Sequence, residues 1–214
     1  KNKKFLQLTR TQQKKILQIP SNLLFLRYNT KHILTVTKKA FATERYEFLI
    51  TNDKHLTIEI IRKDNFNLSS LLSKLSNLDV VNMDVCKLFD DLKYFRIDFS
   101  ETVSDEETGF IEEMIHEAFT SGLKSTPKVP TIQEKEIQID CEHSKSYAVM
   151  YLNCEDQKGL LAFVIYIFDS MGIDIVTAKV HTLKNRVRDM FLIEKNGNFC
   201  HNVETITDKL TGKS

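Results

Sequence analysis

The sequence predicts an α+β protein built from two similar halves, each with an antiparallel sheet that carries helices on one face. Three observations predict this fold. Short β-rich runs and amphipathic helical patterns occur in the order β-β-α-β-β-α in both halves of the 214-residue chain. A segment with two of the three prolines separates the halves. The composition, 42% hydrophobic and 28% charged, is that of a protein that can bury a core.

Residues 1–42 are expected to form a helical connector ahead of the first half. Residues 1–19 are polar and basic with scattered apolar residues, which predicts one or two short surface helices. Pro20 ends this stretch, because proline disfavours helix at the preceding residue. Residues 22–42 are interpreted as helical. Their buried side would comprise Ile33, Leu34, Val36 and Phe41.

The first half, residues 43–120, begins with two β-rich runs at 46–50 and 56–61, whose four-residue polar joint suits a hairpin. A leucine-rich helical face follows, and then two further strands at 80–88 and 93–99. The leucines of that face are Leu68, Leu71, Leu72, Leu75 and Leu78.

A second helix is expected near the end of the first half. Ser104, with Glu107 three residues later, predicts a capping box at its start. The apolar stripe of this helix would comprise Phe110, Ile111, Met114, Ile115, Ala118 and Phe119.

Residues 121–133 are interpreted as a linker, and residues 134–214 as the second half. Gly172 suits the end of the first helix of this half. Strands are expected at 136–141, 147–154, 173–182 and 187–193, and helices at 160–171 and 202–210. Helices on one face of a four-stranded antiparallel sheet make a ferredoxin-like sandwich, here with the edge strand placed first in each half.

Charge and hydropathy exclude several classes of protein. The net charge of +1 gives no general attraction to nucleic acid or to an anionic membrane. The sequence has no apolar run of 18 residues and no signal peptide, so a cytoplasmic protein is expected. The first residue is not Met, so we interpret the chain as part of a longer one. Four widely spaced cysteines are expected to be reduced thiols, with metal binding or disulfides as the alternatives: Cys86, Cys141, Cys154 and Cys200.

Motifs for catalysis are absent from the sequence. There is no phosphate-binding glycine loop, no H-E-x-x-H, no G-x-S-x-G and no His-Asp dipeptide, and the six histidines lack ligand spacing. Asp90-Asp91 is interpreted as a solvated turn rather than a cation site. We therefore expect no catalytic residue, no metal ligand and no cofactor in this chain.

One segment between a predicted strand and a predicted helix, residues 154–161, suits a small ligand. Asp156 can cap the helix and Gly159 permits a close approach. The first-turn N–H groups of Gly159, Leu160 and Leu161 suit a carboxylate, and Asp156 suits an ammonium group. The alternative is purely structural, with Asp156 only as a cap and Gly159 only as a turn residue.

The same segment resembles an ACT domain. The resemblance extends from Asp156-Gln157-Lys158-Gly159-Leu160-Leu161 through the helix to residues 178–183 and 186–191. More narrowly, it is similar to the last ACT domain of bacterial bifunctional uridylyltransferase/uridylyl-removing enzymes, whose pattern is Asp-x-Pro-Gly-Leu-Leu, then Ala-Lys-Ile and Arg-Val-x-Asp-x-Phe. Lys158 stands where that family usually has proline, which removes rigidity from the loop.

The first half resembles the same family more weakly. Residues 25–30, Phe-Leu-Arg-Tyr-Asn-Thr, resemble a stretch that precedes the ACT tandem. Asp64 occupies the position of the first Asp-x-Pro loop, although proline and glycine are both missing, and Asn82 stands in the strand that follows. The ligand-binding residues that the resemblance implies across both halves are Asp156, Gly159, Leu160, Leu161, Ala178, Lys179, Asp64 and Asn82.

The resemblance implies a non-catalytic, allosteric region of a nucleotidyltransferase with hydrolase activity. Its catalytic domains would lie upstream, and the ACT pair would sense a free amino acid, glutamine first, to control uridylylation of the nitrogen-signalling protein PII. ACT domains also pair into dimers. Two other readings remain open: a protein-protein interaction module without a small ligand, and an RNA-binding sandwich, for which Tyr94, Phe95, Tyr147 and Tyr151 offer rings but the RNP1 pattern is absent.

Overall fold

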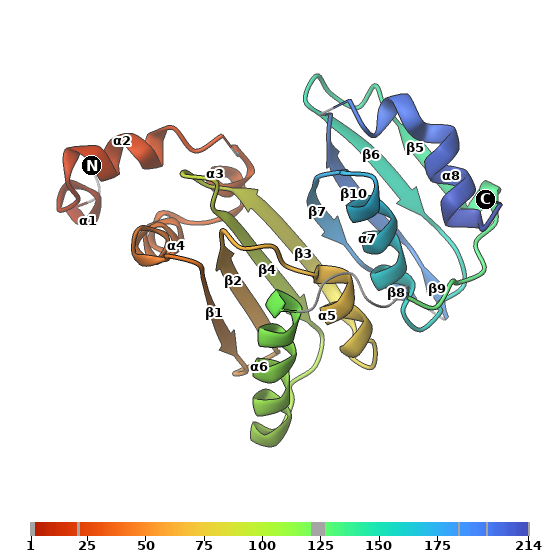
Figure 1. Cartoon of the computed structure of the whole chain (residues 1–214), viewed down its shortest axis with the longest axis horizontal. Coiled ribbons are helices and arrows are strands. Elements are labelled where there is room, and N and C mark those ends of the chain that lie inside the picture. Colours follow the sequence, from red (N-terminus) through yellow and green to blue (C-terminus); the bar gives the residue numbers. More distant parts are fainter. Residues whose placement is uncertain (1–2, 21, 121–126, 184, 196, 214) are drawn as a thin grey trace.

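The computed structural model describes residues 3–20, 22–120, 127–183, 185–195 and 197–213. In this part of the chain the two halves share one antiparallel eight-stranded sheet with the order β1-β2-β4-β3-β7-β10-β6-β5 (Figure 1). The first half supplies β1 (Tyr46–Thr51), β2 (Thr57–Arg62), β3 (Val80–Lys87) and β4 (Lys93–Phe99), and the second supplies β5 (Ile137–Asp140), β6 (Tyr147–Leu152), β7 (Ile175–Lys179) and β10 (Asp189–Glu194). The predicted α+β fold is confirmed, with β1 and β5 at the outer edges.

The halves join through β3 and β7, where Met83 pairs with Ala178. This pairing relates the halves residue by residue. Met83 and Ile58 both flank Ile97, and Ala178 and Met150 both flank Phe191. Ile58 is thus equivalent to Met150. Asp64 follows Ile58 at the same spacing as Asp156 follows Met150, so Asp64 and Asp156 are equivalent.

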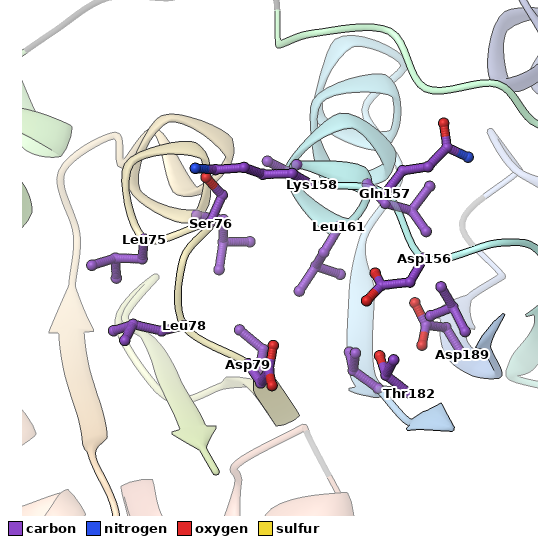
Figure 2. A pocket seen from close by; sticks show the side chains of 17 residues that line it. Leu75, Ser76, Leu78, Asp79, Asp156, Gln157, Lys158, Leu161, Thr182 and Asp189 are labelled. Carbon is purple, nitrogen blue, oxygen red and sulfur yellow. The ribbon is translucent and has the colours of Figure 1, made fainter. Parts of the chain in front are cut away.

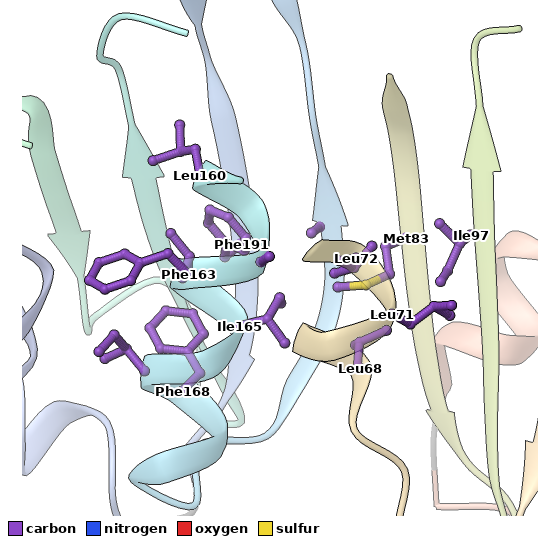
Figure 3. Close-up of a cluster of buried hydrophobic side chains, with 14 of the residues drawn as sticks. Leu68, Leu71, Leu72, Met83, Ile97, Leu160, Phe163, Ile165, Phe168 and Phe191 are labelled. Carbon is purple, nitrogen blue, oxygen red and sulfur yellow. The ribbon is translucent and has the colours of Figure 1, made fainter. Parts of the chain in front are cut away.

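Four helices cover one face of the sheet: α5 (Leu68–Lys74), α6 (Asp105–Thr120), α7 (Leu160–Ser170) and α8 (Val203–Thr211). Side chains from α5 and α7 meet over the centre of the sheet, where Leu72, Met83 and Ile165 belong to one hydrophobic cluster that continues to Phe163, Phe168 and Phe191 (Figure 3). Because this cluster draws on both halves, their cores are continuous.

The connector packs against the opposite face of the first half and reaches the second half at Thr177 of β7. It comprises α1 (Lys3–Leu6), α2 (Arg10–Leu17), α3 (Asn22–Arg27) and α4 (Thr30–Ala42). Leu34 and Val36 of α4 share a second cluster with Ile61, Cys86 and Tyr94 of the sheet. The helical reading of 22–42 is divided in two, because Asn29 caps α4 by accepting the His32 N–H at 2.9 Å.

Several local predictions were wrong or incomplete. Helix α5 ends at Lys74, before Leu78. Phe110 is not on the buried stripe of α6, since it is 52% exposed, whereas the Ser104–Glu107 capping box is confirmed. The predicted strand at 173–182 divides into β7 and β8 (Thr182–Leu183), and β8 forms a small hairpin with β9 (Arg186–Val187). Short 3-10 helices, η1 (Glu134–Glu136) and η2 (Cys200–Asn202), precede β5 and α8.

The cysteine prediction also needs correction, because Cys141 and Cys200 form a disulfide with Cα atoms 5.9 Å apart. These residues are 59 positions apart in sequence, and the fold brings the end of β5 next to η2. Cys86 and Cys154 are buried and form no disulfide. Of the predicted linker, residues 121–126 lie outside the described residues. No helix in the described ranges is long and apolar enough to cross a membrane.

Candidate functional site

A cavity of about 240 Å³ lies where the two halves meet (Figure 2). The C-terminal end of α5 and the residues that lead into β3 line one side, including Leu75, Ser76 and Asp79. The β6–α7 loop, which we define as residues 153–159, lines the other side with Asp156 and Lys158. A small molecule in this cavity would therefore contact both halves at once.

The β6–α7 loop ends in a turn that requires glycine. Gly159 is the N-cap of α7 with φ of +84°, a conformation that side-chain-bearing residues rarely adopt. A Cβ atom built on Gly159 would meet nothing within 4 Å, so the backbone angle, rather than crowding, demands glycine. The expected cap by Asp156 is wrong, because the N-cap position belongs to Gly159 and no side chain caps α7.

Two N–H groups at the start of α7 remain available to a ligand. The Leu160 N–H donates to the Gln157 carbonyl at 3.0 Å, which removes one of the three groups expected to face a carboxylate. The N–H groups of Gly159 and Leu161 donate to no other residue in the described part of the chain. The first turn of a helix carries partial positive charge, so these two groups suit an anionic oxygen.

The loop is held by hydrogen bonds to segments outside it. The Gln157 side chain exchanges two hydrogen bonds with the backbone of Thr131, at 2.7 and 2.8 Å. The Asp156 N–H donates to the carbonyl of Asn185 at 2.9 Å, which ties the loop to the β8–β9 hairpin. Lys158 Nζ donates to Asn77 Oδ1 in the first half. The loop is therefore fixed without the proline found in the ACT pattern.

Asp189, the first residue of β10, lies at the base of the cavity beside Asp156 (Figure 2). It is 2% exposed, and its Oδ1 accepts the His181 N–H at 3.2 Å. Burial raises the pKa of the Asp189 carboxyl to about 7; the His181 N–H opposes this rise, and the charge of Asp156 adds to it. Asp189 is the aspartate of the Arg-Val-x-Asp-x-Phe pattern, but the sequence provided no reason to assign it a ligand role. A carboxylate in register with the buried residues of β10 is nevertheless a signal that alternation can reveal.

The structure brings together four of the residues that the resemblance implies. Asp156, Gly159, Leu160 and Leu161 all line the cavity. Ala178 is buried under the helices on the same face of the sheet, but Val180, two residues further on, lines the cavity instead. The other three residues of the predicted set lie elsewhere: Lys179, Asn82 and Asp64.

Lys179 and Asn82 pair with each other across the β3–β7 seam, and neither lines the cavity. Asn82 Oδ1 accepts a hydrogen bond from Arg27 of the connector at 3.1 Å. Asp64 lies in the β2–α5 loop, where it pairs with Arg45 at 2.8 Å. The predicted residues therefore do not form one group around a single cavity.

A polar junction on the opposite face of the sheet connects all three parts of the molecule. Arg27 Nη1 pairs with Asp84 of β3 at 2.7 Å and donates to Thr177 Oγ1 of β7 at 2.7 Å. Thr177 in turn donates to Asp84 at 2.7 Å. The Asp84 side chain is only 4% exposed, and Tyr28 also donates to it, at 2.6 Å. This Arg27 junction joins the connector to both halves at the seam.

Comparisons with known proteins place the chain beside one curated enzyme. No protein-family model matches the sequence. The chain is 28% identical to the bifunctional uridylyltransferase/uridylyl-removing enzyme of Acinetobacter baylyi, over 55% of this chain and 15% of that enzyme. A similar solved structure is aspartate kinase from Synechocystis, with a TM-score of 0.40 and 10% identity over 73% of this chain and 26% of that chain.

The fold and the cavity between its halves define a tandem α+β arrangement, in which two ferredoxin-like halves share one antiparallel sheet. The sequence similarity to the bifunctional enzyme is consistent with the ACT region of such an enzyme. The chain spans about 15% of the length of this relative.

Proposed function

We propose that this chain is an amino-acid-sensing regulatory region of a bifunctional uridylyltransferase/uridylyl-removing enzyme that acts on the signalling protein PII. The observation that carries the proposal is the cavity shared by the two halves. The N–H groups of Gly159 and Leu161, which donate to no other described residue, are available to a carboxylate, and the Asp156 carboxylate can meet an ammonium group. A free amino acid carries both charges, and glutamine is the first ligand to test.

The position of the cavity at the seam supports a regulatory role. A ligand there contacts the end of α5 in the first half and the start of α7 in the second. It would therefore favour the arrangement of the halves in which both sets of contacts form. The Arg27 junction lies at the same seam on the opposite face, so the connector is placed to carry a change in that arrangement toward catalytic domains of a longer chain.

The experiment is calorimetric titration of the chain with L-glutamine and a panel of other amino acids. The test variant is Gly159→Val. Its matched control is Gly212→Val, since Gly212 also has a positive φ (+70°), has open space around it and lies beyond α8, outside the lining of the cavity. Both substitutions introduce similar backbone strain. We expect binding to be selective and to be lost only in Gly159→Val.

A second candidate is a protein-protein interaction module without a small ligand. Exposed leucines on the connector favour it, because Leu17 is 73% exposed and Leu26 is 79% exposed. Absence of heat with every amino acid up to millimolar concentration would favour this candidate over the sensor. Equal loss of binding in both glycine variants would show that strain, rather than the cavity, controls affinity.

A further inference from the structure

The buried carboxylate of Asp189 has no cationic partner among the residues that the structure describes. It is 2% exposed, and among the described residues it accepts one hydrogen bond, from the His181 N–H. Buried carboxylates in proteins are ordinarily paired with a cation, because an isolated buried charge is costly. The side chain borders the cavity rather than packed core, so a cation in the cavity could reach it.

The groups that face Asp189 do not supply this cation. Asp156 faces it from the β6–α7 loop, and His181 presents its backbone N–H. The Cys154 thiol is nearby and stays protonated, because burial raises its pKa to about 12. Lys158 is the single cationic residue among the described residues that line the cavity, and it donates to Asn77. Asp79, on the opposite wall, adds further negative charge.

We propose that Asp189 and Asp156 together bind the ammonium group of the ligand, and that the cavity therefore selects molecules with a primary ammonium group. This inference rests on the proposed function, because it assigns the residues that would recognise one end of the amino acid. The other end would meet the N–H groups of Gly159 and Leu161. Asp189 thus acts as a binding residue that sits beneath the loop, outside the ACT loop motif itself.

The pairing has a consequence for proton uptake and release. An ammonium group attracts an ionised carboxylate, so binding favours the ionised form of Asp189. With its pKa near 7 in the free protein, Asp189 carries a proton in part of the molecules at neutral pH. Ligand binding would release that proton. Affinity would fall as the pH is lowered from 8 to 5.5, because Asp189 must then be deprotonated before it can pair.

The experiment compares L-glutamine with glutaramate, which is glutamine without its α-amino group, on the wild type and on Asp189→Asn. Removing one charged hydrogen-bonding partner weakens binding by about tenfold to a hundredfold. We expect Asp189→Asn to lose that much affinity for glutamine and to retain its affinity for glutaramate. The dependence of glutamine affinity on pH between 5.5 and 8 should flatten, and proton release, measured in buffers of different ionisation enthalpy, should fall.

Two further variants make the result decisive. Asp53→Asn, in the exposed β1–β2 turn, is the matched control and should bind glutamine as the wild type does. Asp156→Asn, on the exposed side of the loop, should lose affinity even if Asp189→Asn folds poorly. If both Asp189→Asn and Asp156→Asn bind glutamine with the affinity and pH dependence of the wild type, this inference is overturned and the proposed function stands. Failure of the wild type to bind any amino acid would overturn the proposed function together with it.

Discussion

The β6–α7 loop and its counterpart in the first half occupy equivalent positions in the fold, but different side chains fill the space beside each loop. The counterpart, the β2–α5 loop, runs from Lys63 to Asn67, and Asn67 caps α5 as Gly159 caps α7. Phe66 stands at the position of Lys158. Phe66 is 8% exposed and packs against Phe95 and Phe119, at ring-centroid distances of 5.7 and 4.7 Å.

The residues beneath the two loops also differ in their polarity. Phe95 pairs with Ile60 in the first half, as Asp189 pairs with Leu152 in the second, so these two residues are equivalent. Arg62 lies 5.1 Å from the centre of the Phe95 ring and interacts with Asp169 and Asp174 of the second half. The first position is thus filled by the chain's own aromatic and cationic side chains, whereas the second has a buried carboxylate beside a cavity, with no cationic partner among the described residues.

This difference shows that two similar halves can differ in what their equivalent residues contribute. Packing Phe66 inward contributes hydrophobic burial to the first half and uses the space that a ligand would need. Leaving Asp189 buried beside a cavity costs stability, and that cost is recovered only when a cation binds. On the proposed function, the first half therefore serves stability and the second half serves ligand recognition.

The largest expected effect comes from Phe66→Ala. Truncating a buried phenylalanine removes hydrophobic contacts and leaves a cavity, so we expect a loss of about 3–4 kcal/mol in the free energy of unfolding. The equivalent change Lys158→Ala removes an exposed side chain and should cost less than about 0.5 kcal/mol. Urea denaturation measures both. Similar losses of stability in the two variants would contradict the claim that Phe66 packs into the protein whereas Lys158 does not.

The next effect concerns the seam on the opposite face. Arg27→Ala leaves the buried carboxylate of Asp84 without its cation, and we expect it to lower the free energy of unfolding by about 3 kcal/mol. Lys179, the equivalent of Asp84 in the second half, is exposed, so Lys179→Ala should change stability by about 0.5 kcal/mol or less. Thermal unfolding checks the pair. Equal effects would indicate that the connector does not distinguish the halves.

The smallest effect depends on pH. The pKa of Asp189 is about 7 in the folded protein and about 3.9 in an unfolded chain. Between these values the folded protein binds more protons, so the contribution of Asp189 lowers stability as the pH rises from about 4 to 7. This pKa difference corresponds to at most about 4 kcal/mol. Because local relaxation and water lower the cost of the buried charge, we expect Asp189→Asn to stabilise the ligand-free protein at pH 8 by about 2 kcal/mol, and the gain should vanish near pH 4.

The same stability measurement on Asp53→Asn provides the baseline, since that residue is exposed in a turn. If Asp189→Asn increases the free energy of unfolding equally at every pH, ionisation of the buried carboxyl does not destabilise the folded protein. A loss at pH 8 would show that Asp189 has a stabilising partner in the folded protein.

Local patterns were sufficient to predict most elements of the fold. The alternation in residues 46–50 and the capping box at Ser104 depend on near neighbours, so they could be read directly. The contacts that define the site could not. Arg27 meets Thr177 across 150 residues, and Cys141 meets Cys200 across 59. The loop motif located Asp156 and Gly159, but only the folded sheet places Asp189 beneath them.

The most direct test of the account is the position and number of ligand molecules in a crystal structure of the chain grown with saturating L-glutamine. We predict one molecule for each chain, between the β6–α7 loop and the end of α5, with its ammonium group against Asp156 and Asp189. Ligand density at the β2–α5 loop, or an amino acid bound with its ammonium group away from Asp189, would contradict the division of tasks between the two halves.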